Sequence, residues 1–353
     1  MKISFRMFKK VLVGLLATFV VLQAGPAFSA PKSLAEMKPT VWRTQSCVPM
    51  GHYVCQAIVH FGKEVEQRTG GKLKIEVLAS GGLGIPIPKT VSAVRDGLMN
   101  MGEILGAFTH GEFPLSDVME LPGLVPGDLK VRREICKALA PYYEKVLPEK
   151  YNQIYLGSWQ NDARVIALNK KKVNTIGDLK GLKIRASGPN EVSLCKILGA
   201  APVSIATPEV YTAMSQGTVD GCFGADSWLA SAKFWEVTKY IYSMEFDGHQ
   251  MHWSINKQDF MALPPDVQKI VRESAAHAIE WVWPEVASEQ RSGRKMLADH
   301  GVQYVDITSK DWAHFVEISK PIVEEWGKKG GPVALEMLNA TKKVVSGLSK
   351  GKK

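Results

Sequence analysis

The sequence lacks the short motifs that mark many enzyme sites. It has no glycine-rich phosphate loop, and the glycines of "ASGGLGIP" follow an expected strand without opening a helix. The nucleophile pattern GxSxG is absent, which leaves Ser187 and Cys195 as weak nucleophile candidates. No metal set is expected, because His249 and His252 lie three apart in an expected strand and point to opposite faces. We therefore expect no cofactor and no metal.

Cysteine is scarce. The chain has five, and an odd number leaves at least one thiol unpaired within a single chain. Cys47 with Cys55 and Cys195 with Cys222 are the two pairings that could form disulfides, while free buried thiols that pack as small apolar side chains are the alternative. The spacing fits no zinc site.

The first 30 residues have the features of a secretory signal peptide. Four cations precede an apolar run, Val11 to Leu22, that is shorter than the roughly 20 residues of a membrane span. Small residues between Ala27 and Ala30 offer a cleavage site, and no cysteine is present there to carry a lipid. We expect an exported, periplasmic protein, and an uncleaved membrane anchor is the alternative.

Clustered positive charge is missing from the body of the chain. The formal net charge is +9, but the leader supplies four of the cations and the tail another five, Lys342, Lys343, Lys350, Lys352 and Lys353. A nearly neutral body argues against a nucleic-acid partner, which requires a basic face within the domain. Residues 341–353 are expected to form a solvated, frayed end.

The chain left after cleavage, about 320 residues, exceeds the size at which single cores usually stop growing, so two lobes are expected. Strands and helices alternate repeatedly, which predicts an α/β fold with parallel sheets. Strands are expected over 39–47, 72–80, 99–104, 154–160, 163–170, 182–187, 202–206 and 218–224, and helices over 53–71, 88–96, 131–151, 190–200 and 207–217. Beyond residue 248 one strand is followed by helices only, and these are expected to cross both lobes.

Two arginines occupy informative positions. Arg164 begins an expected strand in "NDARVIALN", and Arg185 ends another in "GLKIR", where the turn "ASGP" follows. Ligands of open α/β sheets bind beyond the carboxyl ends of strands, and a guanidinium suits a carboxylate. An ion pair of Arg185 with Glu191 or Asp178 is the structural alternative.

Three blocks of sequence together resemble one family. "FGKEVEQRTGGKLKIEVLASGGLG", "GDLKGLKIRASGPNEVSLCKILGAAPVSIATPEVYTAMSQGTVDG", and "EVTKYIYS" with "NKQDFMALPPDVQKIV" are similar to the extracytoplasmic solute receptors of tripartite ATP-independent periplasmic (TRAP) transporters, the DctP family. The resemblance covers nearly the whole chain after the leader. It implies a two-lobe periplasmic-binding-protein-like fold that closes on an organic acid and delivers it to the small and large subunits of a membrane permease.

The resemblance also implies roles for individual residues. Arg185 matches the arginine that clamps the ligand carboxylate, and Arg164 matches a second arginine that often assists. Glu103 matches a residue that often reaches other ligand groups. The loop after "VDG" lines the ligand pocket in this family, and the matching residues here are Phe223, Asp226 and Trp228.

One departure from the family pattern narrows the expected ligand. Several sialic-acid and dicarboxylate receptors read "VDGQENP", with an asparagine that bonds the solute, whereas this chain reads "VDGCFGADSW" and has Gly224 at that place. Sialic acid is therefore not expected. A less hydroxylated acid is expected instead: a keto acid, an aromatic acid or a short dicarboxylate.

The expected organisation follows from these points. Residues 31–158 with about 249–288 form the first lobe, and residues 159–248 with about 289–340 form the second lobe. The protein is expected to be a monomeric receptor without enzymatic activity. A secreted hydrolase or oxidoreductase that uses the same cleft is the alternative, and it requires a nucleophile and a base within reach of each other.

Overall fold

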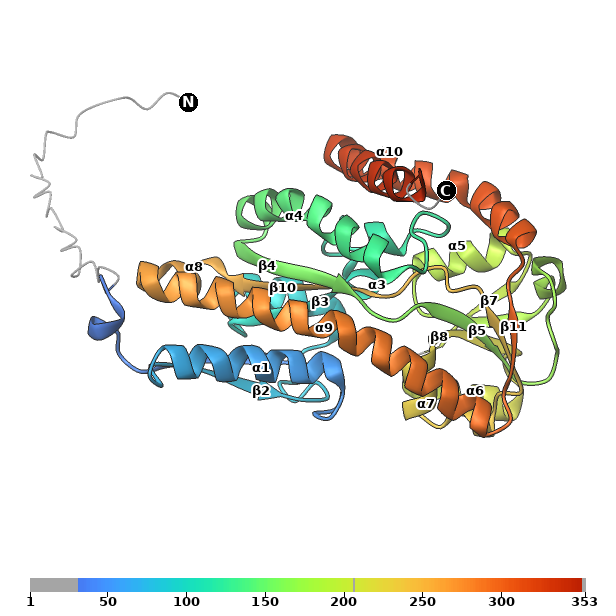
Figure 1. Ribbon diagram of the computed structural model, residues 1–353, viewed down its shortest axis with the longest axis horizontal. Coiled ribbons are helices and arrows are strands. Elements are labelled where there is room, and N and C mark those ends of the chain that lie inside the picture. Colours follow the sequence, from blue (N-terminus) through green and yellow to red (C-terminus); the bar gives the residue numbers. More distant parts are fainter. Residues whose placement is uncertain (1–30, 206, 351–353) are drawn as a thin grey trace, which may run out of the picture.

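The computed structural model describes residues 31–205 and 207–350. The expected signal peptide, the residue Ala206 of one expected strand and the residues 351–353 lie outside these ranges. The described chain forms an elongated molecule with an α/β lobe at each end, and the long helix α9 (Pro265–Asp299) runs along both (Figure 1). The expected two-lobe α/β fold is confirmed.

The remaining elements alternate through most of the chain. The strands are β1 (Thr40–Gln45), β2 (Leu73–Leu78), β3 (Met101–Leu105), β4 (Gln153–Gln160), β5 (Arg164–Leu168), β6 (Lys183–Ala186), β7 (Ala201–Ser204), β8 (Gly221–Ala225), β9 (Tyr240–Ser243), β10 (Gln250–Asn256) and β11 (Gln303–Asp306). The α-helices are α1 (Tyr53–Arg68), α2 (Thr90–Arg95), α3 (Gly106–Thr109), α4 (Leu129–Lys150), α5 (Pro189–Ile197), α6 (Val210–Gln216), α7 (Asp226–Ser231), α8 (Lys257–Met261) and α10 (Ser309–Lys350). Short 3-10 helices are η1 (Leu34–Glu36), η2 (Ile87–Lys89), η3 (Val118–Glu120), η4 (Ile176–Leu179), η5 (Thr207–Glu209) and η6 (Phe234–Glu236).

Local sequence explains the bounds of α1. The ring of His52 caps the helix by accepting a hydrogen bond from the backbone of Val54. Ile58, Phe61 and Val65 follow at spacings of three and four residues, so one face is apolar and buried in the first lobe. The helix ends before Gly70 and Gly71, which adopt positive φ angles that other residues rarely adopt.

The first lobe contains two small sheets. β1 pairs in parallel with β2, as the strand, helix and strand pattern predicted. The second sheet has the order β3-β10-β4, and β10 is antiparallel to both neighbours. β10 follows β5 to β9 in the sequence, so the chain returns to the first lobe after building five of the six strands of the second.

The second lobe is built on a six-stranded sheet of order β11-β9-β5-β8-β6-β7. Strands β6, β7 and β8 are parallel, but β5 is antiparallel to β8 and to β9. The expectation of parallel sheets was therefore wrong for β5 and β10. Both strands come directly after a segment that passes from one lobe to the other: β5 follows β4, and β10 follows β9. β11 was not anticipated, because its four residues lie between two long helices.

The C-terminal helix corrects the expected tail. α10 is interrupted at Gly331, whose backbone angles are not helical, and its second part continues through Lys350; the side chain of Thr341 is fully buried. Val344 and Val345 pack on the core of the first lobe, so the end of the described chain is folded and not frayed from residue 341. Met337 belongs to the same core, which differs from the expected placement of residues 289–340 with the second lobe. The expected bounds of the lobes otherwise stay a prediction.

All five cysteines are free thiols. The two candidate disulfides were therefore wrong. Cys195 and Cys222 belong to different core clusters, one on each face of the six-stranded sheet, which prevents their pairing. In the first lobe the Cys55 sulfur lies 3.8 Å from the sulfur of Met50. The thiols pack as small apolar groups.

Candidate functional site

A cavity with a volume of about 460 Å³ lies between the two lobes. This volume is within the range of about 300 to 1,000 Å³ that is typical of small-molecule sites. The first lobe contributes Cys47, Val48, His52, Tyr53, Val54, Ile87, Leu105, Phe108, His249 and Met251, the segment between β4 and β5 contributes Asn161 and Asp162, and the second lobe contributes Arg185, Glu191, Thr207, Phe223, Gly224, Ala225, Ser227 and Trp228.

The topology of the sheet brings both predicted arginines to one edge. β6 and β8 are parallel, so Arg185 and Ala225 stand near the carboxyl ends of neighbouring strands. β5 is antiparallel to β8, and its first residue, Arg164, pairs with Ala225. An arginine that begins one strand and an arginine that ends another therefore meet at the same edge of the sheet, as ligand sites of this fold class require.

Arg185 lines the cavity and is only 5% exposed. Its Nε donates to the backbone oxygen of Ile205 at 3.0 Å, and its Nη2 donates to the hydroxyl of Thr207 at 3.0 Å. Both acceptors are neutral, and within residues 31–205 and 207–350 no carboxylate forms an ion pair with this arginine. A buried charge normally has an ionic partner, so Arg185 is held in place with its charge uncompensated.

Arg164 is 3% exposed and has very different neighbours. Its Nε and Nη2 donate to the two carboxylate oxygens of Asp247, each at 2.6 Å, and its Nη1 donates to Glu191. Burial by itself lowers the pKa of the guanidinium, but attraction by Asp247 and Glu191 outweighs it and holds the pKa above its usual value. Arg164 does not line the cavity between the lobes. It lies behind the wall and is bound to Glu191, which does line it.

The alternative partners of Arg185 are engaged elsewhere. Glu191 binds Arg164, and its second oxygen accepts from the backbone of Ser187. Asp178 forms a capping box with Thr175 at the start of η4. The structural alternative for Arg185, an ion pair with Glu191 or Asp178, is therefore wrong.

Glu103 lies in β3 beside the cavity but not in its wall. One of its oxygens accepts from the backbone of Cys47 at 3.4 Å, and the other has no hydrogen-bond partner among the described residues. Burial raises the pKa of this carboxyl to about 7, although the hydrogen bond from the backbone of Cys47 lowers it.

The three residues predicted after "VDG" have different positions. Phe223 and Trp228 line the cavity. Asp226 points away from it, and its carboxylate accepts from the hydroxyl of Tyr304 at 2.8 Å. Burial raises the pKa of Asp226 to about 7. Gly224, which stands where several relatives of this family have asparagine, leaves room for Trp228. A Cβ atom at position 224 would lie 3.0 Å from the indole ring.

Sequence reasoning missed several lining residues. Asp162 accepts from the backbone and the hydroxyl of Ser227, at 3.0 and 2.9 Å, and so connects the segment between β4 and β5 to α7. His52 stacks on Tyr53 at 4.6 Å between ring centroids. Burial lowers the pKa of His52 to about 4, so its ring is neutral at physiological pH. "QNDAR" places Asp162 just before Arg164, and this proximity was the only signal in the sequence.

The nucleophile candidates lie outside the cavity. Cys195 is fully buried, and burial raises the pKa of its thiol to about 12, which keeps it protonated. The Ser187 hydroxyl is buried and does not line the cavity. His249 does line it, but its ring is bonded to Glu120 at 2.9 Å. Within the described ranges no group of three histidine, cysteine or acidic side chains could hold a metal ion.

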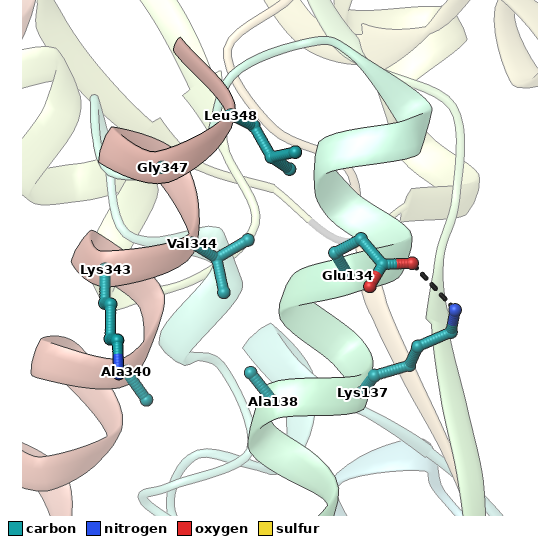
Figure 2. Close-up of a pocket in the computed structure, with 8 residues that line it drawn as sticks. All are labelled: Glu134, Lys137, Ala138, Ala340, Lys343, Val344, Gly347 and Leu348. Carbon is teal, nitrogen blue, oxygen red and sulfur yellow. Dashed lines mark hydrogen bonds and ion pairs between the residues drawn. The ribbon is translucent and has the colours of Figure 1, made fainter. Parts of the chain in front are cut away.

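A second hollow lies on the outside of the molecule, between α4 and α10, with a volume of about 690 Å³ (Figure 2). Its wall includes the apolar side chains of Val344 and Leu348. Glu134 and Lys137 line it too, and they pair with each other at 2.7 Å. It is an open groove at the surface, and it contains none of the converging buried polar groups of the cavity between the lobes.

In the part of the chain that the structure covers, no helix is long and apolar enough to cross a membrane.

Comparison with known proteins identifies relatives across nearly the whole chain. The 2,3-diketo-L-gulonate-binding periplasmic protein of Escherichia coli is 26% identical over 329 residues, which cover 93% of this chain and 98% of the relative. The C4-dicarboxylate-binding protein of Bacillus subtilis is 26% identical over 280 residues, which cover 77% of this chain and 75% of that protein.

Solved structures share the fold. An extracytoplasmic solute receptor of Bordetella pertussis that binds pyroglutamic acid matches with a TM-score of 0.79 and 26% identity, over 86% of this chain and all of that one. A sugar acid binding protein of Advenella mimigardefordensis in complex with galactonate matches with a TM-score of 0.77 and 23% identity, over 87% of this chain and 99% of that one. The second likeness shows the fold alone.

The family model for DctP, described as bacterial extracellular solute-binding protein, family 7, matches residues 45–329. This range includes both lobes and every predicted site residue. The chain belongs to the DctP family of extracellular solute-binding proteins.

Proposed function

We propose that this chain is the receptor component of a TRAP-type transporter, that it binds an organic carboxylate between its lobes, and that Arg185 anchors the carboxylate. The observation that carries the proposal is the buried guanidinium of Arg185, which lines the cavity and has only neutral partners. A ligand carboxylate would supply the missing negative charge and could accept two parallel hydrogen bonds.

A comparison of free energies indicates that closure of the two lobes on the ligand must contribute to affinity. A hydrogen bond to a charged group contributes roughly 1.5 to 3 kcal/mol, whereas micromolar binding requires about 8 kcal/mol. Walls from both lobes enclose the cavity, so contacts of the ligand body with both lobes can supply the rest. The closed form is then the form that docks on the permease.

Export and partners belong to the same proposal. The leader would be a signal peptide that directs the chain to the periplasm, and the chain would act as a monomer with the small and large permease subunits. No chemical step is proposed. The cavity would hold the ligand and release it unchanged, so incubation of a bound acid with the purified protein should yield no product by mass spectrometry.

The test of the anchor is calorimetric titration. A thermal-shift screen over organic acids, including pyroglutamate, 2,3-diketo-L-gulonate and succinate, would first identify binders, because a ligand that binds only the folded form raises its stability. We expect Arg185→Gln to lower the affinity for such an acid by about 100-fold, or about 2.7 kcal/mol, which is within the roughly 1.5 to 3 kcal/mol of one hydrogen bond to a charged group.

The control is Arg43→Gln, which removes an exposed arginine of β1 that is not part of the cavity wall and should leave binding unchanged. A normal affinity in the Arg185 variant would refute the anchor.

A further inference from the structure

The basic side chains of the cavity wall differ in whether they already have partners within the protein. Among the lining residues that the structure describes, Arg185 alone has a permanent positive charge. The other two basic side chains in the wall are histidines. His52 uses Nδ1 to accept from the backbone of Val54, and His249 is bonded to Glu120. One cation is therefore available to a ligand.

The acidic groups of the wall are already satisfied, and they add negative potential. Asp162 accepts two hydrogen bonds from Ser227, and Glu191 is bonded to Arg164 and to the backbone of Ser187. A second ligand carboxylate would find no free cation and would share the cavity with two carboxylates. Burying an uncompensated charge is strongly unfavourable.

The rest of the wall is mainly apolar and aromatic. The first lobe supplies Tyr53, Ile87 and Phe108, and the second lobe supplies Phe223 and Trp228. Trp228 occupies the space over Gly224, and its ring also packs on Phe234. Aromatic rings from both lobes therefore line the same cavity as Arg185. Such a surface favours the apolar body of a ligand. The Tyr53 hydroxyl is buried without a hydrogen-bond partner among the described residues, so it can bond one polar group of a ligand, but the aromatic and aliphatic wall offers no set of donors for many hydroxyl groups.

We infer that the cavity selects a monocarboxylic acid with an apolar body, and that it discriminates against dicarboxylates and polyhydroxylated sugar acids. This inference rests on the proposed function, because it takes Arg185 as the anchor of the single carboxylate. It removes the short dicarboxylate from the ligands expected from the sequence.

The experiment compares acids that differ only at the far end. Hexanoate and adipate have the same number of carbon atoms, and 3-phenylpropanoate and 3-(4-carboxyphenyl)propanoate share a ring. In each pair the second acid carries an additional carboxylate. D-Gluconate represents the hydroxylated acids. Calorimetric titration of the full mature protein at pH 7.5 should give an affinity about 100-fold or more higher for the monocarboxylate of a pair.

A variant with a second cation in the wall tests whether the single cation causes the preference for monocarboxylates. Ile87 lines the cavity from the first lobe, whereas Arg185 lines it from the second. Ile87→Lys should supply a second cation and narrow the difference between adipate and hexanoate by about tenfold or more. Leu98→Lys adds the same charge at an exposed position outside the wall and should leave the ratio unchanged.

The outcomes separate the inference from the function on which it rests. Equal or tighter binding of the dicarboxylates, or tight binding of D-gluconate, together with loss of binding in Arg185→Gln, would overturn the monocarboxylate preference but keep the anchor. Binding that is unaffected by Arg185→Gln would overturn the anchor. A panel in which no apolar monocarboxylate binds would also overturn the preference.

Discussion

Two arginines at one edge of the same sheet show how differently a buried charge can be used. Arg164 and Arg185 are 3% and 5% exposed, and both lie at the end of a strand. Arg164 is bonded through all three nitrogens to carboxylates, whereas Arg185 donates only to a backbone oxygen and a hydroxyl. The first arginine is compensated by the protein, and the second has its charge available to the cavity.

This difference assigns the two residues different tasks. The contacts of Arg164 join β5, the segment after β9 and α5, and so fix the wall on which Glu191 lies. Arg185 is held by weaker, neutral contacts that orient the guanidinium without neutralising it. In our proposal Arg164 is a positioning residue, and Arg185 is the residue that touches the ligand.

The largest expected effect concerns stability. Arg164→Met leaves Asp247 and Glu191 buried without their cation, and loss of one partner of a buried ion pair typically costs about 3 to 5 kcal/mol. Urea denaturation should show this loss. Arg185→Met leaves no buried carboxylate behind, and its unfolding free energy should change by about 1 kcal/mol or less. Equal losses in the two variants would remove the distinction between the arginines.

A third buried charge sharpens the comparison, because Glu103 lacks the partners that Asp247 has. Its pKa of about 7 in the folded protein lies above the usual 4.5. The folded state therefore binds a proton that the unfolded state has lost between these values, and stability falls as the pH rises from about 4.5 to 7. Glu103→Gln should remove this fall and make the protein more stable than the wild type at pH 8, by about 2 to 4 kcal/mol.

Thermal or urea unfolding of both proteins at pH 5 and pH 8 checks this expectation. The difference between variant and wild type should grow with pH. A constant difference at both values would show that ionised Glu103 has a partner that compensates its burial.

The smallest expected effect concerns the orientation of Arg185. Thr207→Val removes the hydroxyl that accepts from Nη2 but keeps the shape of the side chain. We expect affinity for a carboxylate to fall by roughly tenfold, which is the worth of one hydrogen bond, with little change in stability. Thr207→Ser keeps the acceptor and should bind normally. A full effect in the serine variant would mean that packing of the threonine methyl, and not the hydrogen bond, is important.

Much of the fold was predictable, because local patterns determine it. The apolar spacing of α1, the alternation in β2 and the position of Gly217, which ends α6 with a φ of 72°, are all visible in the sequence. The placement of Arg185 at a strand's carboxyl end followed from the same reasoning. Strand direction in β5 and β10 did not, because it depends on where the chain crosses between lobes.

The site was predictable only in part. Whether an arginine is compensated depends on residues distant in sequence, and Asp247 lies 83 positions from Arg164. Asp226 was predicted to face the ligand from its position after "VDG", but the turn into α7 directs it to Tyr304. Contacts of this kind arise from tertiary packing, which no local pattern reports.

The buried free cysteines can serve as probes of local unfolding in each lobe. Cys136 is buried in the first lobe, and Cys195 and Cys222 are buried on opposite faces of the sheet in the second. Burial raises the pKa of each of these thiols to about 12, so alkylating reagents should react with them only after local or global unfolding. Timed alkylation followed by peptide mass spectrometry would therefore measure the opening rates of the two lobes separately, without any amino-acid substitution.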